Sequence, residues 1–184
     1  MSANGIGAGG ADAAALDELL QRRRIEDVVL RYCRGIDRLD AEAVRDCYHP
    51  DGTDRHTGFF GARDEFVVWV MEAVRRFDGT MHLVGNHLSE LDGDRATAET
   101  YGLAFHWGTP ADDPRLNFVS AFRYADRLER REGEWRILAR TAVREWTRAL
   151  DGAGWIPPEG EAPSGSRDAG DPVYRAGARR GPRP

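Results

Sequence analysis

Two short segments of the chain hold side chains that can transfer protons. Residues 32–40 contain Tyr32 and Asp37, and residues 80–87 contain His82. A carboxylate and an imidazole can hold and move a proton near neutral pH, and a phenol can donate a hydrogen bond to developing negative charge. Each residue also has an ordinary structural explanation, as a helix-end aspartate, a strand histidine or a core tyrosine. The residues alone leave both explanations open.

The spacing of the histidines argues against a metal site. In a strand over residues 80–87, side chains alternate between the two faces, so His82 shares a face with Asn86 while His87 lies on the other. His82 and His87 therefore do not form a metal pair. The remaining histidines, His49, His56 and His106, follow no metal-ligand spacing. We expect no metal.

Composition narrows the class of protein. The chain has 184 residues, of which 41% are hydrophobic and 31% charged, which is typical of one soluble globular domain. The net charge of -5, with acidic and basic residues interleaved, argues against nucleic acid as the main partner. No apolar run approaches the ~18 residues of a membrane span, and the N-terminus lacks the features of a secretory signal.

Other chemistries lack the residues they need. All 26 basic residues are arginine, so Schiff-base chemistry on lysine is excluded. No glycine-rich nucleotide-binding pattern is present, and we expect no cofactor. The only two cysteines, Cys33 and Cys47, cannot form a disulfide framework or a CxxC pair. We therefore expect the protein to be located in a reducing cytoplasm.

Helices in the first half and strands in the second predict an α+β fold. Apolar residues at steps of three and four predict helices from residue 16 to about 36 and over 62–77, and Asp40 is a suitable N-cap for a short helix over 41–48. The turn-forming residues 49–52 follow that helix. Aromatic and β-branched residues predict a meander of strands over 80–91, 96–107, 116–128 and 135–147. Asp92-Gly93 is a hairpin signal between the first two.

Both ends of the chain differ in composition from the middle. Residues 1–11 are mostly small and are expected to be disordered, and 151–184 form a tail that holds six of the nine prolines. The folded domain is therefore expected over 12–150. Within the tail, residues 155–158 could fold back onto the domain or onto a neighbouring subunit.

Several other side chains are candidates for binding a substrate. Aromatic residues could line an apolar cavity, although such residues usually form plain core. The candidates selected are Phe60, Trp69, Asn86 and Phe118. Arg140 and Arg144 on the last strand could meet an anionic substrate, but a solvated sheet face is the preferred interpretation for them.

Six motifs, in this order along residues 12–150, resemble the SnoaL-like branch of the nuclear transport factor 2-like (NTF2-like) superfamily. They are residues 32–40, 47–52, 60–66, 82–86, 92–96 and 133–137. The resemblance implies a cone-shaped α+β barrel, in which three N-terminal helices pack on a curved antiparallel sheet around a deep apolar pocket. It also implies a homodimer, since such proteins commonly pair sheet to sheet.

Fold alone does not decide function in this superfamily, which includes dehydratases, isomerases, epoxide hydrolases and transport factors without catalysis. Scytalone dehydratase-like, dehydrochlorinase-like and bile-acid dehydratase-like members share an Asp at the end of the first helix that faces a His on the first long strand. Asp37 and His82 match these positions, and Tyr32 matches a tyrosine of the bile-acid dehydratase-like members. The Asp–Arg–Asp group of epoxide hydrolase-like members has no clear match.

The resemblance therefore implies that Asp37, His82 and Tyr32 are catalytic residues. The expected protein is a cofactor-independent lyase (dehydratase) or isomerase that acts on a hydrophobic, carbonyl-bearing ring compound, such as a polyketide or a steroid. The alternative is a non-catalytic ligand-binding or assembly protein of the same fold. An open pocket around Asp37 and His82 would favour the enzyme, and a filled cone would favour the alternative.

Overall fold

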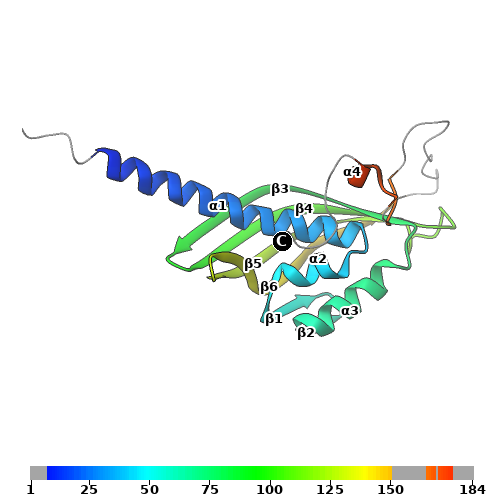
Figure 1. Ribbon diagram of the computed structural model, residues 1–184. Coiled ribbons are helices and arrows are strands. Elements are labelled where there is room, and N and C mark those ends of the chain that lie inside the picture. The colour runs from blue at the N-terminus through cyan, green and yellow to red at the C-terminus, as the bar shows by residue number, and fades with distance from the viewer. Residues whose placement is uncertain (1–7, 151–164, 169, 176–184) are drawn as a thin grey trace, which may run out of the picture.

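Three helices form one layer of the fold. The computed structural model describes residues 8–150, 165–168 and 170–175, and its helices α1 (Ala8–Asp37), α2 (Ala41–Asp46) and α3 (Arg63–Val74) confirm the three that the sequence predicts. The backbone amide of Ala43 donates to the Asp40 carboxylate at 3.1 Å, which is the expected N-cap of α2. Helix α1 begins inside the segment 1–11, and its first turns extend past the end of the sheet (Figure 1).

Six strands form the second layer. They are β1 (Tyr48–His56), β2 (Phe59–Ala62), β3 (Gly79–Asp92), β4 (Arg95–Trp107), β5 (Phe118–Arg131) and β6 (Glu134–Ala149). Their order across the sheet is β2-β1-β6-β5-β4-β3. The predicted meander is confirmed as β3 to β6, with tight turns at Gly93 and Gly133, whose positive φ angles of 60° and 82° favour glycine.

The sheet is mixed, so the expected antiparallel pairing holds for the meander β3 to β6 and not for the pairing of β1 with β6. Strand β1 pairs in parallel with β6 and antiparallel with β2. Its register on β6 shifts between Tyr48 and Thr53, so the predicted turn residues 49–52 lie in a bulge within the strand.

Further register shifts interrupt the β5–β6 pairing between Ala121 and Phe122 and between Arg127 and Leu128. Such bulges bend and twist a sheet.

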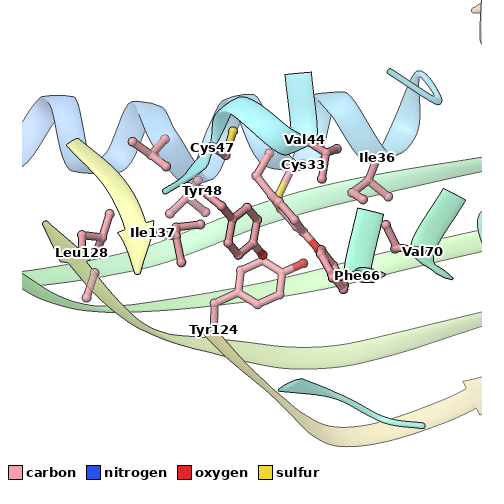
Figure 2. Close-up of a cluster of buried hydrophobic side chains, with 14 of the residues drawn as sticks. Cys33, Ile36, Val44, Cys47, Tyr48, Phe66, Val70, Tyr124, Leu128 and Ile137 are labelled. Atoms are coloured by element: carbon pink, nitrogen blue, oxygen red, sulfur yellow. The ribbon is translucent and has the colours of Figure 1, made fainter. Parts of the chain in front are cut away.

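The core lies between the helices and the concave face of the sheet. Figure 2 shows Cys33 and Ile36 of α1, Val44 of α2 and Phe66 of α3 facing side chains of the sheet. Partners from the sheet include Tyr48, Tyr124, Leu128 and Ile137, all at most 2% exposed. The same residues that give α1 its apolar spacing thus fix the helix against the strands.

A segment near the C-terminus ties two helices together. The guanidinium of Arg167 donates to the backbone oxygens of Asp37, Val74 and Phe77 at 3.3, 3.0 and 2.8 Å. Asp171 lies 3.3 Å from Arg38, just before α4 (Pro172–Arg175). Part of the expected tail therefore packs on the ends of α1 and α3. Residues 155–158, which the sequence suggests could fold back, lie outside the described residues.

No helix in the described part of the chain is long and apolar enough to cross a membrane.

Candidate functional site

The helices and the concave face of the sheet enclose a pocket of about 310 Å³. Its walls are largely aromatic and aliphatic, with contributions from α3 and from the inward faces of β4, β5 and β6. The polar side chains that also line it are Tyr32, His56, Thr57, Arg76, His82, His106, Ser120, Tyr124 and Arg144. The cone is therefore open in its interior, and several groups able to exchange protons or hydrogen bonds face that space.

Asp37 and His82 meet at the wall of this pocket, as the sequence predicts. Asp37 is the last residue of α1, and its Oδ1 lies 2.7 Å from Nδ1 of His82 on β3. The other carboxylate oxygen accepts from the backbone amide of His82 at 2.9 Å, and Oδ1 also accepts from the hydroxyl of Thr80 at 3.0 Å. The two side chains are only 11% and 9% exposed.

The hydrogen bond to Asp37 determines which ring nitrogen of His82 carries the proton. Because a carboxylate only accepts hydrogen bonds, the proton of the neutral ring lies on Nδ1. Among the described residues, no hydrogen bond engages Nε2, the nitrogen left for the pocket. The lone pair on Nε2 can therefore take up a proton, and the carboxylate stabilises the imidazolium that forms.

Tyr32 lies deeper in the same wall. It is 1% exposed, and its ring packs edge-on against Tyr124 with 5.6 Å between ring centroids. Burial raises the pKa of the Tyr32 phenol well above its ordinary value, so the phenol stays protonated near neutral pH. Tyr32 can thus act on a ligand through a hydrogen bond, and does not act as an anion.

Arg140 is buried behind the pocket, so the expectation of a solvated sheet face is wrong for this residue. Its guanidinium makes two hydrogen bonds to the Asp126 carboxylate, at 2.8 and 2.6 Å, and both side chains are 0% exposed. It also lies over the rings of Tyr32 and Tyr124, 4.2 and 3.9 Å from their centroids. Arg144, by contrast, is exposed and lines the pocket.

Two histidines of the pocket were not selected from the sequence. His56 on β1 pairs through Nδ1 with Oδ1 of Asp54, a carboxylate that is 0% exposed. His106 on β4 stacks on Phe118 with ring centroids 4.3 Å apart, and burial lowers its pKa to about 4. The signal for the first pair is the Asp-x-His spacing, which puts both side chains on one face of a strand, but it requires knowing that residues 48–56 form a strand.

The structure places two of the four predicted binding residues in the wall of the pocket and two outside it. Trp69 and Phe118 line the pocket, whereas Phe60 and Asn86 do not, so the expectation is wrong for these two. Phe60 is 66% exposed beneath the Arg55 guanidinium, because its neighbour Phe59 takes the inward position. Asn86 is exposed at a bulge in β3.

The same bulge, between Val84 and His87, overturns the predicted alternation of the two histidines. His87 pairs with Thr100 and His82 with Ala104, and these partners, four residues apart on β4, share one face. The Nδ1 atom of His87 lies 2.8 Å from the hydroxyl of the buried Thr100. His82 and His87 therefore lie on the same side of the sheet. Among the residues that the structure describes, no three His, Cys, Asp or Glu side chains are grouped to hold a metal ion.

The chain belongs to the family of proteins with a SnoaL-like domain, whose model matches residues 17–141. The matched range contains the whole helical layer beyond the first turns of α1 and most of the sheet. It includes both members of the Asp37–His82 pair. The fold that the sequence motifs imply, an NTF2-like α+β fold with helices on a curved sheet, is thus confirmed.

Solved structures of the same fold are similar over most of their length. The dehydrochlorinase LinA-type3 of Novosphingobium barchaimii, which acts on hexachlorocyclohexane, is 20% identical with a TM-score of 0.67, over 78% of this chain and 99% of that one. A candidate scytalone dehydratase of Novosphingobium aromaticivorans is 21% identical with a TM-score of 0.64, over 76% and 97%.

The protein Rv3472 of Mycobacterium tuberculosis, of unknown function, is 24% identical with a TM-score of 0.62, over 71% of this chain and 75% of that one. None of the curated proteins matches the chain. At these identities the similarity shows the fold, and the chemistry has to be argued from the site.

Proposed function

We propose that the protein is a cofactor-independent lyase of the dehydratase type, or an isomerase, with His82 as the proton-transfer base. The observation that carries the proposal is that Nδ1 of His82 is held by Asp37 while Nε2 is left for an apolar pocket. Two of the similar structures carry the names of a dehydrochlorinase and a candidate dehydratase, names that denote the loss of hydrogen chloride and of water. The open pocket favours this proposal over an assembly protein with a filled cone.

The proposed reaction begins at a carbon next to a carbonyl group. Nε2 of His82 removes the proton from this carbon, and the electron pair of the C–H bond moves toward the carbonyl as an enolate. In a dehydratase this pair then forms a C=C bond as the neighbouring C–O bond breaks, and the oxygen takes up a proton and leaves as water; in an isomerase His82 returns the proton to another carbon. Tyr32 donates a hydrogen bond to the developing oxyanion.

The pocket suggests the class of substrate. Its aromatic lining, which includes Trp69, Phe118 and Phe122, fits a hydrophobic ring compound, and Arg144 fits a polar or anionic substituent. A volume of about 310 Å³ lies near the lower end of ligand pockets, roughly 300–1,000 Å³. A compact polyketide-like ring therefore fits the proposal better than a larger steroid.

The test is a panel of cyclic β-hydroxy ketones with one and two rings, together with β,γ-unsaturated ketones. Formation of the conjugated enone is followed by ultraviolet absorbance. We expect turnover of at least one compound by the wild type, and a loss of about 10²–10⁴-fold in His82→Gln with an unchanged melting temperature. His87→Gln, which alters another histidine of β3 outside the pocket, is the control and keeps wild-type turnover.

A different result would refute the proposal. If a member of the panel is turned over and His82→Gln keeps the wild-type rate, His82 is not the base. If compounds bind in the pocket with micromolar affinity and none is converted, the protein is a binding protein of this fold.

Two further features enter the proposal. The outward face of the sheet exposes Met81, Leu83 and Tyr101, which are 51%, 60% and 43% exposed, and we propose that it pairs with a second copy in a homodimer. Cys33 and Cys47 are both free and buried, in keeping with a proposed cytoplasmic location.

A further inference from the structure

A second carboxylate–imidazole pair lies in the wall of the same pocket, and the proposed function does not use it. Asp54 and His56 are two residues apart on β1 and project from the same side of the strand. Oδ1 of Asp54 is hydrogen-bonded to Nδ1 of His56, and Oδ2 accepts a hydrogen bond from the phenol of Tyr48 at 2.5 Å. Both oxygens of this fully buried carboxylate thus have partners.

The second pair repeats the geometry of Asp37 and His82. In each pair Nδ1 faces a buried carboxylate, the ring lines the pocket, and no described residue forms a hydrogen bond with Nε2. The side chain of His56 is 20% exposed, whereas Asp54 is 0% exposed. A ligand in the pocket can therefore reach the imidazole and cannot reach the carboxylate.

Two aromatic rings separate the imidazoles. The ring of His82 contacts Phe122 with centroids 5.8 Å apart, and that of His56 contacts Tyr124 at 6.4 Å. The rings of Phe122 and Tyr124 themselves lie 4.5 Å apart, and both line the pocket. A small ring compound lying against this aromatic pair would occupy the space that both imidazoles line.

The side chains that pack around the ring of His56 carry no charge near neutral pH. Its side chain packs on Phe66 and Trp69 of α3 and on Tyr124 of β5, which are uncharged. Burial raises the pKa of both Tyr48 and Tyr124, so neither phenol adds charge near neutral pH. The nearby buried cation, Arg140, is engaged by Asp126.

A buried carboxylate is unfavourable without a compensating charge. A proton on the His56 ring supplies that charge directly to Asp54, because the two groups already share a hydrogen bond. Nδ1 is held by Asp54 and the ring lines the pocket, so a proton on Nε2 can be donated to a ligand there.

We infer that His56 is a second catalytic residue, the general acid that protonates the leaving oxygen while His82 removes the proton from carbon. This inference rests on the proposed function. The C–H electron pair forms the C=C bond, the C–O bond breaks, and the oxygen takes the proton of His56 and departs as water. His82 ends protonated and His56 neutral, and solvent exchange returns both to their starting states.

Leaving groups of different basicity test this role. Hydroxide needs protonation to depart, whereas 4-nitrophenoxide does not, so only the first substrate depends on the acid. The probes are 3-hydroxycyclohexanone, followed by the absorbance of cyclohexenone, and 3-(4-nitrophenoxy)cyclohexanone, followed by the colour of released nitrophenolate. Rates are measured above the uncatalysed background for the wild type, His56→Gln and His82→Gln.

We expect His56→Gln to lose about 10²–10⁴-fold on the hydroxy ketone and less than about 3-fold on the nitrophenoxy ketone. His82→Gln should lose activity on both. Asp54→Asn keeps the imidazole and the shape of the site, and it should lower the rate with the hydroxy ketone selectively. This variant keeps the test valid if His56→Gln fails to fold.

Equal losses on the two substrates in His56→Gln and in Asp54→Asn would overturn the inference and assign the pair a structural role. Wild-type rates on the hydroxy ketone in both variants would overturn it as well. If His82→Gln retains both rates while His56→Gln still depends on the leaving group, the acid assignment stands and the proposed base fails. The two assignments can therefore fail separately.

Discussion

Asp37 is hydrogen-bonded to His82 twice, to the ring nitrogen Nδ1 at 2.7 Å and to the backbone amide at 2.9 Å. The carboxylate is thus fixed to the strand as well as to the imidazole that it orients. Its position at the C-terminal end of α1 is electrostatically unfavourable for an anion, because the helix dipole is negative there. The hydrogen bonds from β3 offset this and join the helix to the strand at the site.

The third donor to this carboxylate, Thr80, is expected to have a positioning role. Thr80→Val removes its hydrogen bond to Oδ1 and leaves both contacts with His82. We expect the free energy of unfolding to fall by about 1 kcal/mol, with only a few-fold loss in turnover. Urea denaturation and kcat on a substrate of the proposed panel measure the two effects. Thr80→Ser should restore both, and a loss as large as that of Asp37→Asn would contradict this role.

The buried pair of Arg140 and Asp126 is expected to be strongly coupled. Arg140→Met alone leaves Asp126 as an uncompensated buried charge, which costs about 3–5 kcal/mol in such pairs. Asp126→Leu should cost a similar amount, and the double variant should be less destabilised than either single one. Unfolding free energies of the four proteins give the coupling directly. Additive effects would show that the pair contributes nothing beyond its separate packing.

His106 is expected to make stability depend on pH. Burial lowers the pKa of its ring from 6.5 to about 4, so below pH 6.5 the unfolded chain takes up a proton that the folded protein excludes. Stability from this group is therefore constant above pH 6.5 and falls as the pH drops toward 4. Between pH 7 and pH 4.5 the loss is about 2–3 kcal/mol.

His106→Phe keeps the stacking on Phe118 and removes the titrating ring. Urea denaturation of the wild type and this variant at the two pH values should show a smaller pH effect in the variant. An identical pH effect in both proteins would rule out His106 as its source.

The outward face of the sheet is expected to form the contact between two copies. Leu83→Glu places a charge among Met81 and Tyr101, and it should convert a dimer at micromolar concentration into a monomer. Sedimentation velocity measures the change. Val68→Glu is the matched control, because Val68 is similarly exposed at 57% but lies on α3. A wild-type monomer, or a variant that still dimerises, would place any contact elsewhere.

The helices, the meander and the Asp37–His82 contact could be predicted because their signals are local or ordered along the chain. The apolar stripe of α1 from Ile25 to Ile36 is read directly from spacing, and all its members are buried. The pairing of Asp37 with His82 spans 45 residues, and it followed from matched motifs. Neither residue indicates its partner by type alone.

The features that escaped prediction depend on contacts distant in sequence. Residues 49–52 are turn formers, and they lie within β1 because Tyr48 and Thr53 on either side of them pair with β6. The interior position of Arg140 depends on Asp126 on the neighbouring strand, because an arginine is rarely buried without a partner. The bulge that turns Asn86 outward leaves no clear mark in the sequence.

The order of the strands sets how far apart the two pocket imidazoles can be. His82 lies on β3 and His56 on β1, with β4, β5 and β6 between them. The straight-line distance between the two imidazoles therefore depends on how strongly the sheet curves. The bulges at Ala121–Phe122 and Arg127–Leu128 lie on the intervening strands and help to set that curvature. Inserting or deleting one residue at these bulges would change the curvature of the sheet and, with it, the distance between the two imidazoles. Evolution could therefore adapt the site to a longer or shorter molecule without replacing any side chain that touches it.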